Sequence, residues 1–499
     1  MIVIHDDDLR RSITDAFQLI SFAHPRDFVR HLTHAWGREE SALAKNAMGQ
    51  ILVNSRMALL GRRPICQDTG VASVFLRVGM NVRIETDRSI EEIVNEGVRA
   101  AYRDEANPLR SSIVADPLFG RRNTGDNTPA MIHTELVPGD TIEVFASAKG
   151  AGSENKTKFG VLLPRDDVVS WVVDRVAEMG AGWCPPGVLG IGVGGSAERA
   201  MLLAKKALFD PLDMHELLLK GPSSKVEEMR LEIYRRVNAL GIGAQGLGGT
   251  TTVLDVKILT HPTHAASLPV ALVPNCAAHR HVHFTLDGSG PANLVAPGVE
   301  DWPQIVLDQA EINTRHVDLG TLNRTDVHTW RAGETLLLSG RLLTARDAAH
   351  HRVVGLMKDG MPLPVPLEGR VIYYVGPVDA VGDEVIGPAG PTTASRMDPF
   401  MDSILGAGGA LATIGKGERG PEAIDAIKRH GAASLIAVGG AAFLISQSIR
   451  SARVVAFEDL GMEAIHEFEV RDLPVVVAVD STGRSIHEDG PLRWRRMEA

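Results

Sequence analysis

The chain has 499 residues, of which 44% are hydrophobic, 23% charged and 5% aromatic; this composition is typical of a globular protein, and the length is enough for about two to four domains. Its 52 Lys and Arg residues against 62 Asp and Glu residues give a formal charge of −10, which excludes a general electrostatic affinity for nucleic-acid phosphates. Three cysteines are too few for a disulfide framework, the N-terminus lacks the pattern of a signal peptide, and no apolar run approaches the length of a membrane span, so we expect a cytoplasmic protein.

The first long helix is predicted from Ala44 onward, where apolar residues recur with the 3.6-residue period of a buried helical face. Gly61 supplies a stop signal for this helix, and Pro64 prevents its continuation. A second helix begins at the capping box of Ser89 and Glu92. The loop that follows Pro64 therefore leaves the end of a packed helix, which makes it a rigid mount for a ligand.

All three cysteines lie at breaks in regular structure that are rich in glycine and proline. Cys66 lies in PICQDTG, Cys184 in GWCPPG and Cys276 in PNCAAH. Their separations in the chain exclude a local zinc knuckle, which needs CxxC-type spacing. Three separate thiolates suit an iron–sulfur cluster with one iron free of protein ligands, because a four-iron cluster has four irons to satisfy. The alternative is three unrelated buried cysteines, which behave as small hydrophobic residues.

A glycine-rich loop with flanking lysines follows a predicted strand at residues 142–148. The loop runs KGAGSENK and offers backbone N–H groups that suit an anion; an ordinary hairpin is the alternative. Arg110 lies in the polar stretch before this strand, and on its own it is typical of a solvated surface arginine.

Residues 188–195 satisfy the pattern GxGxxG after a strand-like run, through Gly190, Gly192 and Gly195. Ser196 is placed to cap the helix that follows. A dinucleotide site fails on context, because the next predicted element is another helix and not the second strand of a βαβ unit. We therefore expect these glycines to let the backbone pass close to something bulky.

The pattern of apolar and polar residues changes after a polar stretch at residues 313–333. Short apolar runs typical of strands then alternate with helical segments, which predicts an α/β domain. The predicted strands are 336–338, 371–375, 435–438, 454–457 and 475–479, and the predicted helices are 421–429 and 441–449. We accordingly predict an α+β N-terminal domain at 1–320, a linker at 321–335 and a smaller α/β C-terminal domain at 336–499.

Three cations occupy unusual loops of the C-terminal half. Arg346 lies in ARDAAHH, Arg396 in GPTTASRMD and Lys416 in GKG. Arginine binds a carboxylate through two parallel hydrogen bonds, so a dicarboxylate substrate would use more than one such residue. A metal site in one domain opposite a cationic carboxylate clamp in the other is the arrangement expected for a metal-assisted hydro-lyase.

Six motifs resemble those of the class I, iron–sulfur-dependent fumarate hydratases, in that family's order and over nearly the whole chain. They are PICQDTG, GSENKTKF, CPPGVLGIGVGG, PTHAASLPVALVPNC, GPTTASRMDPF and GKG. The resemblance implies a [4Fe-4S] cluster held by Cys66, Cys184 and Cys276 in the N-terminal domain. It also implies an α/β C-terminal domain that swivels, and a homodimer with each site between the two domains.

Matched motif by motif, the resemblance also assigns residues to the substrate and to proton transfer. The implied substrate contacts are Gln67, Arg110, Gly150, His264, Arg346, Arg396 and Lys416. Thr392 is the implied base, with Asp68 as its proton partner. The implied reaction is the reversible hydration of fumarate to (S)-malate, with no nucleic-acid or membrane partner.

Several alternatives stay open. Mesaconate, the 2-methyl analogue of fumarate, differs by one methyl group, which changes pocket preference by only about 1–3 kcal/mol. Tartrate is the substrate of related dehydratases that divide these domains between two chains. An electron-transfer protein would normally give its cluster four protein ligands, and an iron-sensing RNA-binding protein would need a basic face that the net charge does not indicate.

Overall fold

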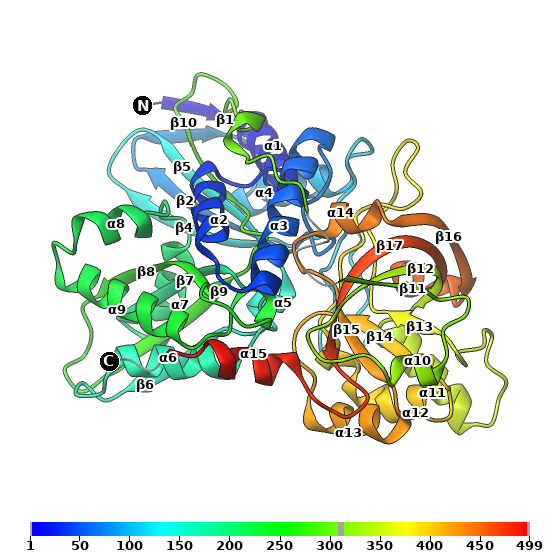
Figure 1. Ribbon diagram of the computed structural model, residues 1–499. Helices are drawn as coiled ribbons and strands as arrows, with labels where there is room; N and C mark the ends of the chain where they lie inside the picture. The colour runs from blue at the N-terminus through cyan, green and yellow to red at the C-terminus, as the bar shows by residue number, and fades with distance from the viewer. Residues whose placement is uncertain (1, 308–313, 497–499) are drawn as a thin grey trace.

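The computed structural model describes residues 2–307 and 314–496. Figure 1 shows them as two regions, with most N-terminal elements on the left and most C-terminal elements, coloured green to red-orange, on the right, while the last helix, in red, reaches back toward the left. None of the helices in these residues has both the length and the apolarity needed to cross a bilayer. The observed mixture of helices and sheets in two regions agrees with the coarse architecture predicted above.

The first part of the N-terminal region is a sheet packed against two helices. Its strands, in spatial order, are β10 (His281–Leu286), β5 (Ile142–Lys149), β2 (Val71–Gly79) and β4 (Met131–Val137), and a small parallel pair joins β1 (Ile2–His5) to β3 (Val82–Glu85). Helices α1 (Asp6–Phe22) and α4 (Ile90–Tyr102) share one apolar core with this sheet. The predicted capping box of Ser89 and Glu92 is confirmed at the start of α4.

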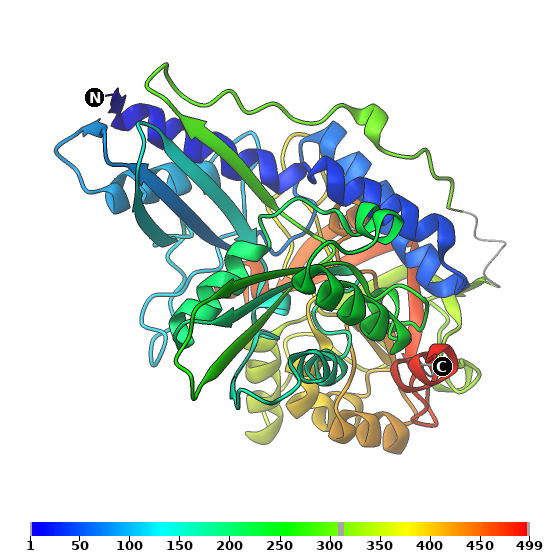
Figure 2. The same ribbon diagram turned by 90° about the vertical axis from the view of Figure 1, so that its left-hand side faces the viewer.

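A second sheet carries two of the three cysteines at its ends. Its strands, in spatial order, are β6 (Lys158–Leu162), β9 (Leu268–Asn275), β7 (Gly187–Gly194) and β8 (Val253–His261). Helices α6 (Val168–Met179), α8 (Met214–Lys220) and α9 (Lys225–Ala239) share one core with it, and α7 (Ala197–Ala207) belongs to the core that α2 (Arg26–Arg38) and α3 (Ala42–Gly61) also enter. The chain from 287 to 307 runs along these N-terminal helices (Figure 2).

The glycines of the GxGxxG pattern serve the packing of α7 on β7. A Cβ at Gly192 would collide with the carbonyl oxygen of Ala200, and a Cβ at Gly190 with that of Ala204. These close contacts with the backbone of α7 confirm the expected close approach. The element that follows α7 is the helix α8 and not a strand, as expected. The predicted cap is wrong, because the Ser196 hydroxyl donates to the Glu198 carboxylate and accepts no backbone N–H of the helix.

The C-terminal region is built on a seven-stranded mixed sheet. In spatial order its strands are β11 (Thr314–Asp318), β12 (Thr335–Thr344), β13 (Val371–Tyr373), β14 (Ala412–Gly415), β15 (Ala433–Ile436), β17 (Ile465–Val479) and β16 (Ile449–Ala456). Its helices are α10 (Arg324–Val327), α11 (Asp347–Lys358), α12 (Met401–Leu405), α13 (Pro421–His430), α14 (Ala442–Ser446) and α15 (Ile486–Trp494). Strand β11 pairs in parallel with β12, so this sheet includes residues from the span predicted as the N-terminal domain, and α10 lies in the predicted linker.

Two local predictions need correction. Gly61 is the last residue of α3 and not the residue that follows the helix, and the left-handed residue that caps the end is Arg62, with φ of 50°. The loop after β5 is neither a hairpin nor an open loop. It is the short helix α5 (Ala151–Glu154), with Gly150 at its N-cap position.

Asn54 on α3 joins the two regions. Its side chain is fully buried, and its Nδ2 donates to the carbonyl oxygens of Ile65 at 3.0 Å and Gly440 at 2.9 Å. Its Oδ1 accepts from the backbone N–H groups of Phe443 and Leu444, both at 2.9 Å. One amide therefore holds the loop before Cys66 against the start of α14.

Replacing Asn54 by alanine removes the partner of three backbone groups in the interior, the carbonyl of Gly440 and the N–H groups of Phe443 and Leu444, while the carbonyl of Ile65 keeps the N–H of Ala442. We expect Asn54→Ala to destabilise the protein by about 2–4 kcal/mol and to lower the midpoint of thermal unfolding. Asn46→Ala, on the same helix, is the matched control, because Asn46 is only half-buried and accepts one bond from Gln50. Equal midpoints for the two variants would show that Asn54 does not hold the regions together.

Candidate active site

The three cysteines converge although they come from three separate turns. Cys66 follows α3, Cys184 precedes β7 and Cys276 follows β9. The N–H of Ala277 donates to the carbonyl oxygen of Cys184 at 3.0 Å, and Ala278 packs in one small cluster with Cys66 and Cys276. Cys184 also takes a left-handed backbone with φ of 61°, a conformation that costs energy in a non-glycine residue and is enriched at functional sites.

The electrostatics place the three sulfur atoms near one another and near one lysine. Burial raises the pKa of the Cys184 thiol to about 11, the charge of Lys416 opposes this shift, and the charges of Cys276 and Cys66 add to it. Burial alone would lower the pKa of Lys416, but the three cysteines and Asp68 together raise it above its ordinary value. An ammonium group thus lies among three potential thiolates.

Three free thiols are the donor atoms that an iron–sulfur cluster with three protein ligands would need. Among the residues that the structure describes, no three His, Cys, Asp or Glu side chains are grouped so as to hold one metal ion. An iron–sulfur cluster binds each thiolate through a different iron, so its thiolates stand farther apart. The chain offers three thiols without disulfides, two of them buried and one half-buried.

Lys416 reaches this site from the other region. It follows β14, its N–H donates to the carbonyl oxygen of Thr392 at 3.0 Å, and its own carbonyl oxygen accepts from Ala394 at 2.8 Å. Close approach requires a glycine at 439, because a Cβ there would lie 2.7 Å from the Cys184 sulfur and 3.3 Å from Lys416 Cδ. Gly439 is in turn held by the Gln245 side chain at 2.8 Å.

Asp68 lies next to Gly150. Its carboxylate accepts from the N–H of Ala151 at 2.9 Å and of Gly70 at 3.2 Å, and a Cβ at Gly150 would lie 3.0 Å from Oδ2. Burial would raise the pKa of Asp68, but the charges of Arg110, Arg280 and Lys416 lower it below its ordinary value. Asp68 is therefore a carboxylate at neutral pH.

Gln67 contacts the loop that carries Thr392 across the two regions. The amide Nε2 of Gln67 donates to the carbonyl oxygen of Pro391 at 3.1 Å, and the Cys66 thiol donates to Oε1 of Gln67 at 3.3 Å. Thr392 is buried, and its N–H donates to the carbonyl oxygen of Tyr374 at 2.7 Å. The predicted base is thus fixed in the loop that covers Gln67.

Three arginines approach one another in the same part of the molecule. Arg110 Nη1 donates to the carbonyl oxygen of Gly376 at 2.6 Å, and a Cβ at Gly376 would collide with the guanidinium of Arg346. The pKa of Arg346 is lowered to about 10, first by burial and then by the charge of Arg110, with Arg396 adding to the shift. Arg396 is 43% exposed and forms an ion pair with Asp347 at 2.5 Å. Mutual repulsion of these cations makes this part of the site receptive to an anion.

His264 is the predicted contact that a single chain does not bring to the others. It is exposed in the turn between β8 and β9. Cys276 follows the opposite end of β9, an eight-residue strand, which spans about 25 Å at 3.2–3.4 Å per residue.

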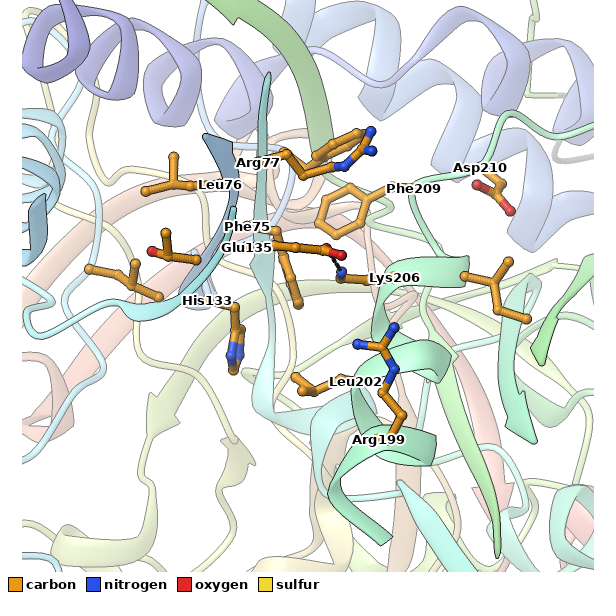
Figure 3. A pocket seen from close by; sticks show the side chains of 14 residues that line it. Phe75, Leu76, Arg77, His133, Glu135, Arg199, Leu202, Lys206, Phe209 and Asp210 are labelled. Atoms are coloured by element: carbon orange, nitrogen blue, oxygen red, sulfur yellow. Dashed lines mark hydrogen bonds and ion pairs between the residues drawn. The ribbon is translucent and has the colours of Figure 1, made fainter. Parts of the chain in front are cut away.

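A cavity of about 560 Å³ lies in the N-terminal region between β2, β4 and α7. Figure 3 shows Phe75, His133 and Phe209 around it, with Lys206 joined to Glu135 at 2.8 Å. None of the predicted site residues lines it. The volume of this cavity therefore does not identify the site. The thiols and cations that converge at the contact between the two regions do identify it.

A two-region chain with three converging cysteines on one side and buried cations on the other has the architecture of a hydro-lyase site for anions. A family model described as "Fumarate hydratase (Fumerase)" matches residues 10–285, and "Fumarase C-terminus" matches residues 288–490. The chain belongs to the fumarate hydratase (Fumerase) family.

Relatives agree with this assignment. "Fumarate hydratase class I, anaerobic" of Escherichia coli K12 is 31% identical over 455 residues, which cover 88% of this chain and 82% of the relative. "Fumarate hydratase 2" of Leishmania major is 32% identical over 462 residues, covering 88% and 78%. "Putative L(+)-tartrate dehydratase subunit alpha" of Methanocaldococcus jannaschii is 36% identical over 275 residues, covering 54% of this chain and 94% of the relative.

The motifs missed three groups that the structure places at the site. They are Arg280, Gln245 and Gly376. Arg280 had a local signal, because it follows Cys276 within CAAHRH. Gln245 and Gly376 carry no such signal, because each acts through a partner from the other region.

Proposed function

We propose that this chain is a hydro-lyase that interconverts fumarate and (S)-malate with a [4Fe-4S] cluster held by Cys66, Cys184 and Cys276. One observation carries the proposal: Lys416 of the C-terminal region is buried among three cysteines and Asp68 of the N-terminal region. The family and its relatives support the reaction.

When bound, the cluster would supply an iron without a protein ligand, which acts as a Lewis acid toward the substrate oxygens. The chain's own residues supply the rest. We assign one substrate carboxylate to the guanidinium groups of Arg346 and Arg396, because a forked donor binds a carboxylate through two bonds. Arg110, which lies beside Arg346, and the Gln67 amide would orient the rest of the dicarboxylate.

In the direction from malate to fumarate, a proton leaves the carbon next to the bound carboxylate. This carbon is weakly acidic, so the negative charge that develops on the carboxylate needs fixed cations, which the two arginines and Lys416 provide. Thr392 is the proposed acceptor of this proton, and as its oxygen takes the proton its own hydroxyl proton would pass to Asp68. Asp68, ionised by its cationic neighbours, is its proposed proton partner.

The substrate is tested anaerobically on protein reconstituted with iron and sulfide. The ultraviolet absorbance of the enoate is followed with fumarate and with mesaconate, side by side. We expect faster turnover of fumarate. Faster turnover of mesaconate would leave the proposed site unchanged and make mesaconate the assigned substrate. No turnover of either compound by protein with full iron content would contradict the proposal.

The finer architecture belongs to the same proposal. We propose an N-terminal cluster-binding domain and a C-terminal α/β domain that swivels to admit substrate, with the boundary between residues 287 and 314, where the family models divide and β11 begins. We also propose a cytoplasmic homodimer. The dimer would account for His264, whose side chain is exposed far from the cysteines of its own chain and would reach the site of a second copy.

Mixing two inactive variants tests this role of His264. If His264 acts on the partner's site, a dimer of one His264→Ala chain and one Lys416→Met chain contains one intact site and one site with both defects. Random mixing then restores about a quarter of wild-type activity, because half of the dimers are mixed. Absence of recovery in mixtures that have exchanged subunits would place His264 outside the partner's site.

A further inference from the structure

Arg280 is a buried arginine that forms no ion pair within 4 Å among the residues that the structure describes. It is 1% exposed, and its Nε and Nη1 have no hydrogen-bond acceptor among the residues that the structure describes. Other buried arginines of the chain are paired: Arg63 with Glu384 at 2.8 Å, and Arg230 with Asp255 at 3.1 Å. A guanidinium stays protonated in proteins, so Arg280 keeps its charge.

An unpaired buried cation is strongly destabilising, because it loses its hydration without gaining an opposite charge. Water would not remove this cost. The cavity beside Arg280 has a volume of about 20 Å³, room for about one water, and a water solvates a cation without neutralising it. The other charged side chains that line this cavity are Lys149 and Lys205, which are cations as well.

The missing anion must lie toward the cysteines. Arg280 follows Cys276 by four residues, and its carbonyl oxygen accepts from the N–H of Ala148 at 3.2 Å, which fixes the segment against β5. Ala278, in the same segment, packs in one cluster with Cys66.

Two other anions do not satisfy the Nε and Nη1 donors of Arg280. The carboxylate of Asp68 accepts from backbone N–H groups and faces Arg110 at 3.8 Å, and no hydrogen bond joins it to Arg280 in the described structure. A substrate carboxylate leaves at every turnover. A fully enclosed cation needs an anion that stays.

We propose that Arg280 is the resident counter-cation of the cluster and donates hydrogen bonds to its sulfur atoms from the enclosed side of the site. The inference rests on the proposed cofactor. A cluster with three thiolate ligands carries net negative charge, and its sulfur atoms accept N–H bonds that tune its reduction potential. The contribution of Arg280 to the free energy of unfolding would thus be favourable in the cluster-loaded protein and unfavourable in the cluster-free protein.

Arg280→Met tests this opposition, because methionine keeps the length and removes the charge. Unfolding midpoints are measured anaerobically for the cluster-free and reconstituted forms, together with the rate of iron loss to a chelator and the reduction potential of the cluster. We expect the unfolding midpoint of the cluster-free protein to rise by about 2 °C or more and that of the reconstituted protein to fall. Iron loss to the chelator should become at least about tenfold faster, and the reduction potential of the cluster should become more negative. Arg280→Lys, which restores a charge without the fork, should lie between.

Arg230→Met is the matched control. Arg230 is buried and paired with Asp213 and Asp255, so its loss should destabilise both forms alike and leave the potential unchanged. The inference would be overturned if Arg280→Met also destabilised both forms alike and left the potential unchanged. It would also be overturned if Arg280→Met failed to fold without a cluster, or lost iron at the wild-type rate. A raised KM with unchanged iron loss would instead assign Arg280 to the substrate. If the wild-type protein took up no cluster, the proposed cofactor itself would be wrong. That result would be distinguishable, because it needs no variant.

Discussion

Replacing Cys184 by serine is expected to abolish both cluster retention and hydratase activity. A serine hydroxyl binds iron far more weakly than a thiolate, and Cys184 is held in its left-handed turn beside Lys416, with no fourth cysteine in the chain to replace it. The measurement is iron and sulfide content per chain after anaerobic reconstitution, with turnover measured on the same sample. We expect less than about 1% of wild-type activity.

The cluster-free protein provides the control. Serine and cysteine differ by one atom, so the unfolding midpoint of cluster-free Cys184→Ser should stay within about 2 °C of wild type. A variant that retains full iron content and turnover would remove Cys184 from the ligand set. A variant that fails to fold without a cluster would show that the sulfur serves packing instead.

Lys416→Met is expected to lower kcat by about 10²–10³-fold when activity is expressed per cluster. Removing one fixed charge that stabilises a developing anion typically has this effect. Lys416 is 8% exposed, lies among the three cysteines and Asp68, and is joined to the Thr392 loop by its own backbone. Expressing turnover per cluster separates loss of chemistry from loss of cofactor.

Lys156→Met is the matched control for this variant. Lys156 is also a lysine at the contact between the two regions, but it forms an ion pair with Glu418 at 3.1 Å and is 28% exposed. Its loss should change kcat by less than about threefold. If Lys416→Met and Lys156→Met had equal turnover per cluster, Lys416 would have no part in stabilising the charge that develops on the substrate.

Local patterns in the sequence predicted much of the fold. The helix period after Ala44, the capping box at Ser89 and the apolar runs of the C-terminal half correspond to α3, α4 and strands of the seven-stranded sheet. Each depends on contacts within a few residues or on one buried face. The prediction failed where pairing was long-range: β11 looked like a polar boundary, because it is a five-residue strand with one buried residue.

The candidate site divides in the same way. Residues within motifs, such as Cys66, Gln67 and Asp68, were predictable because adjacent residues share one rigid turn. Arg280 could have been noticed beside Cys276, but its missing partner is visible only when every neighbour is in place. His264 shows the opposite case, since its motif suggested a contact that one chain does not make.

The sequence by itself determined the chemical types: three cysteines at turns, a carboxylate beside the first of them, and cations in the C-terminal loops. Only the tertiary structure decided which of these meet. Asn54 and Gly439 bring Lys416 to the cysteines through contacts between residues hundreds of positions apart, and burial then shifts the pKa values of the thiols and of Lys416. Desolvation and charge proximity depend on distances in space, and a linear pattern does not contain them.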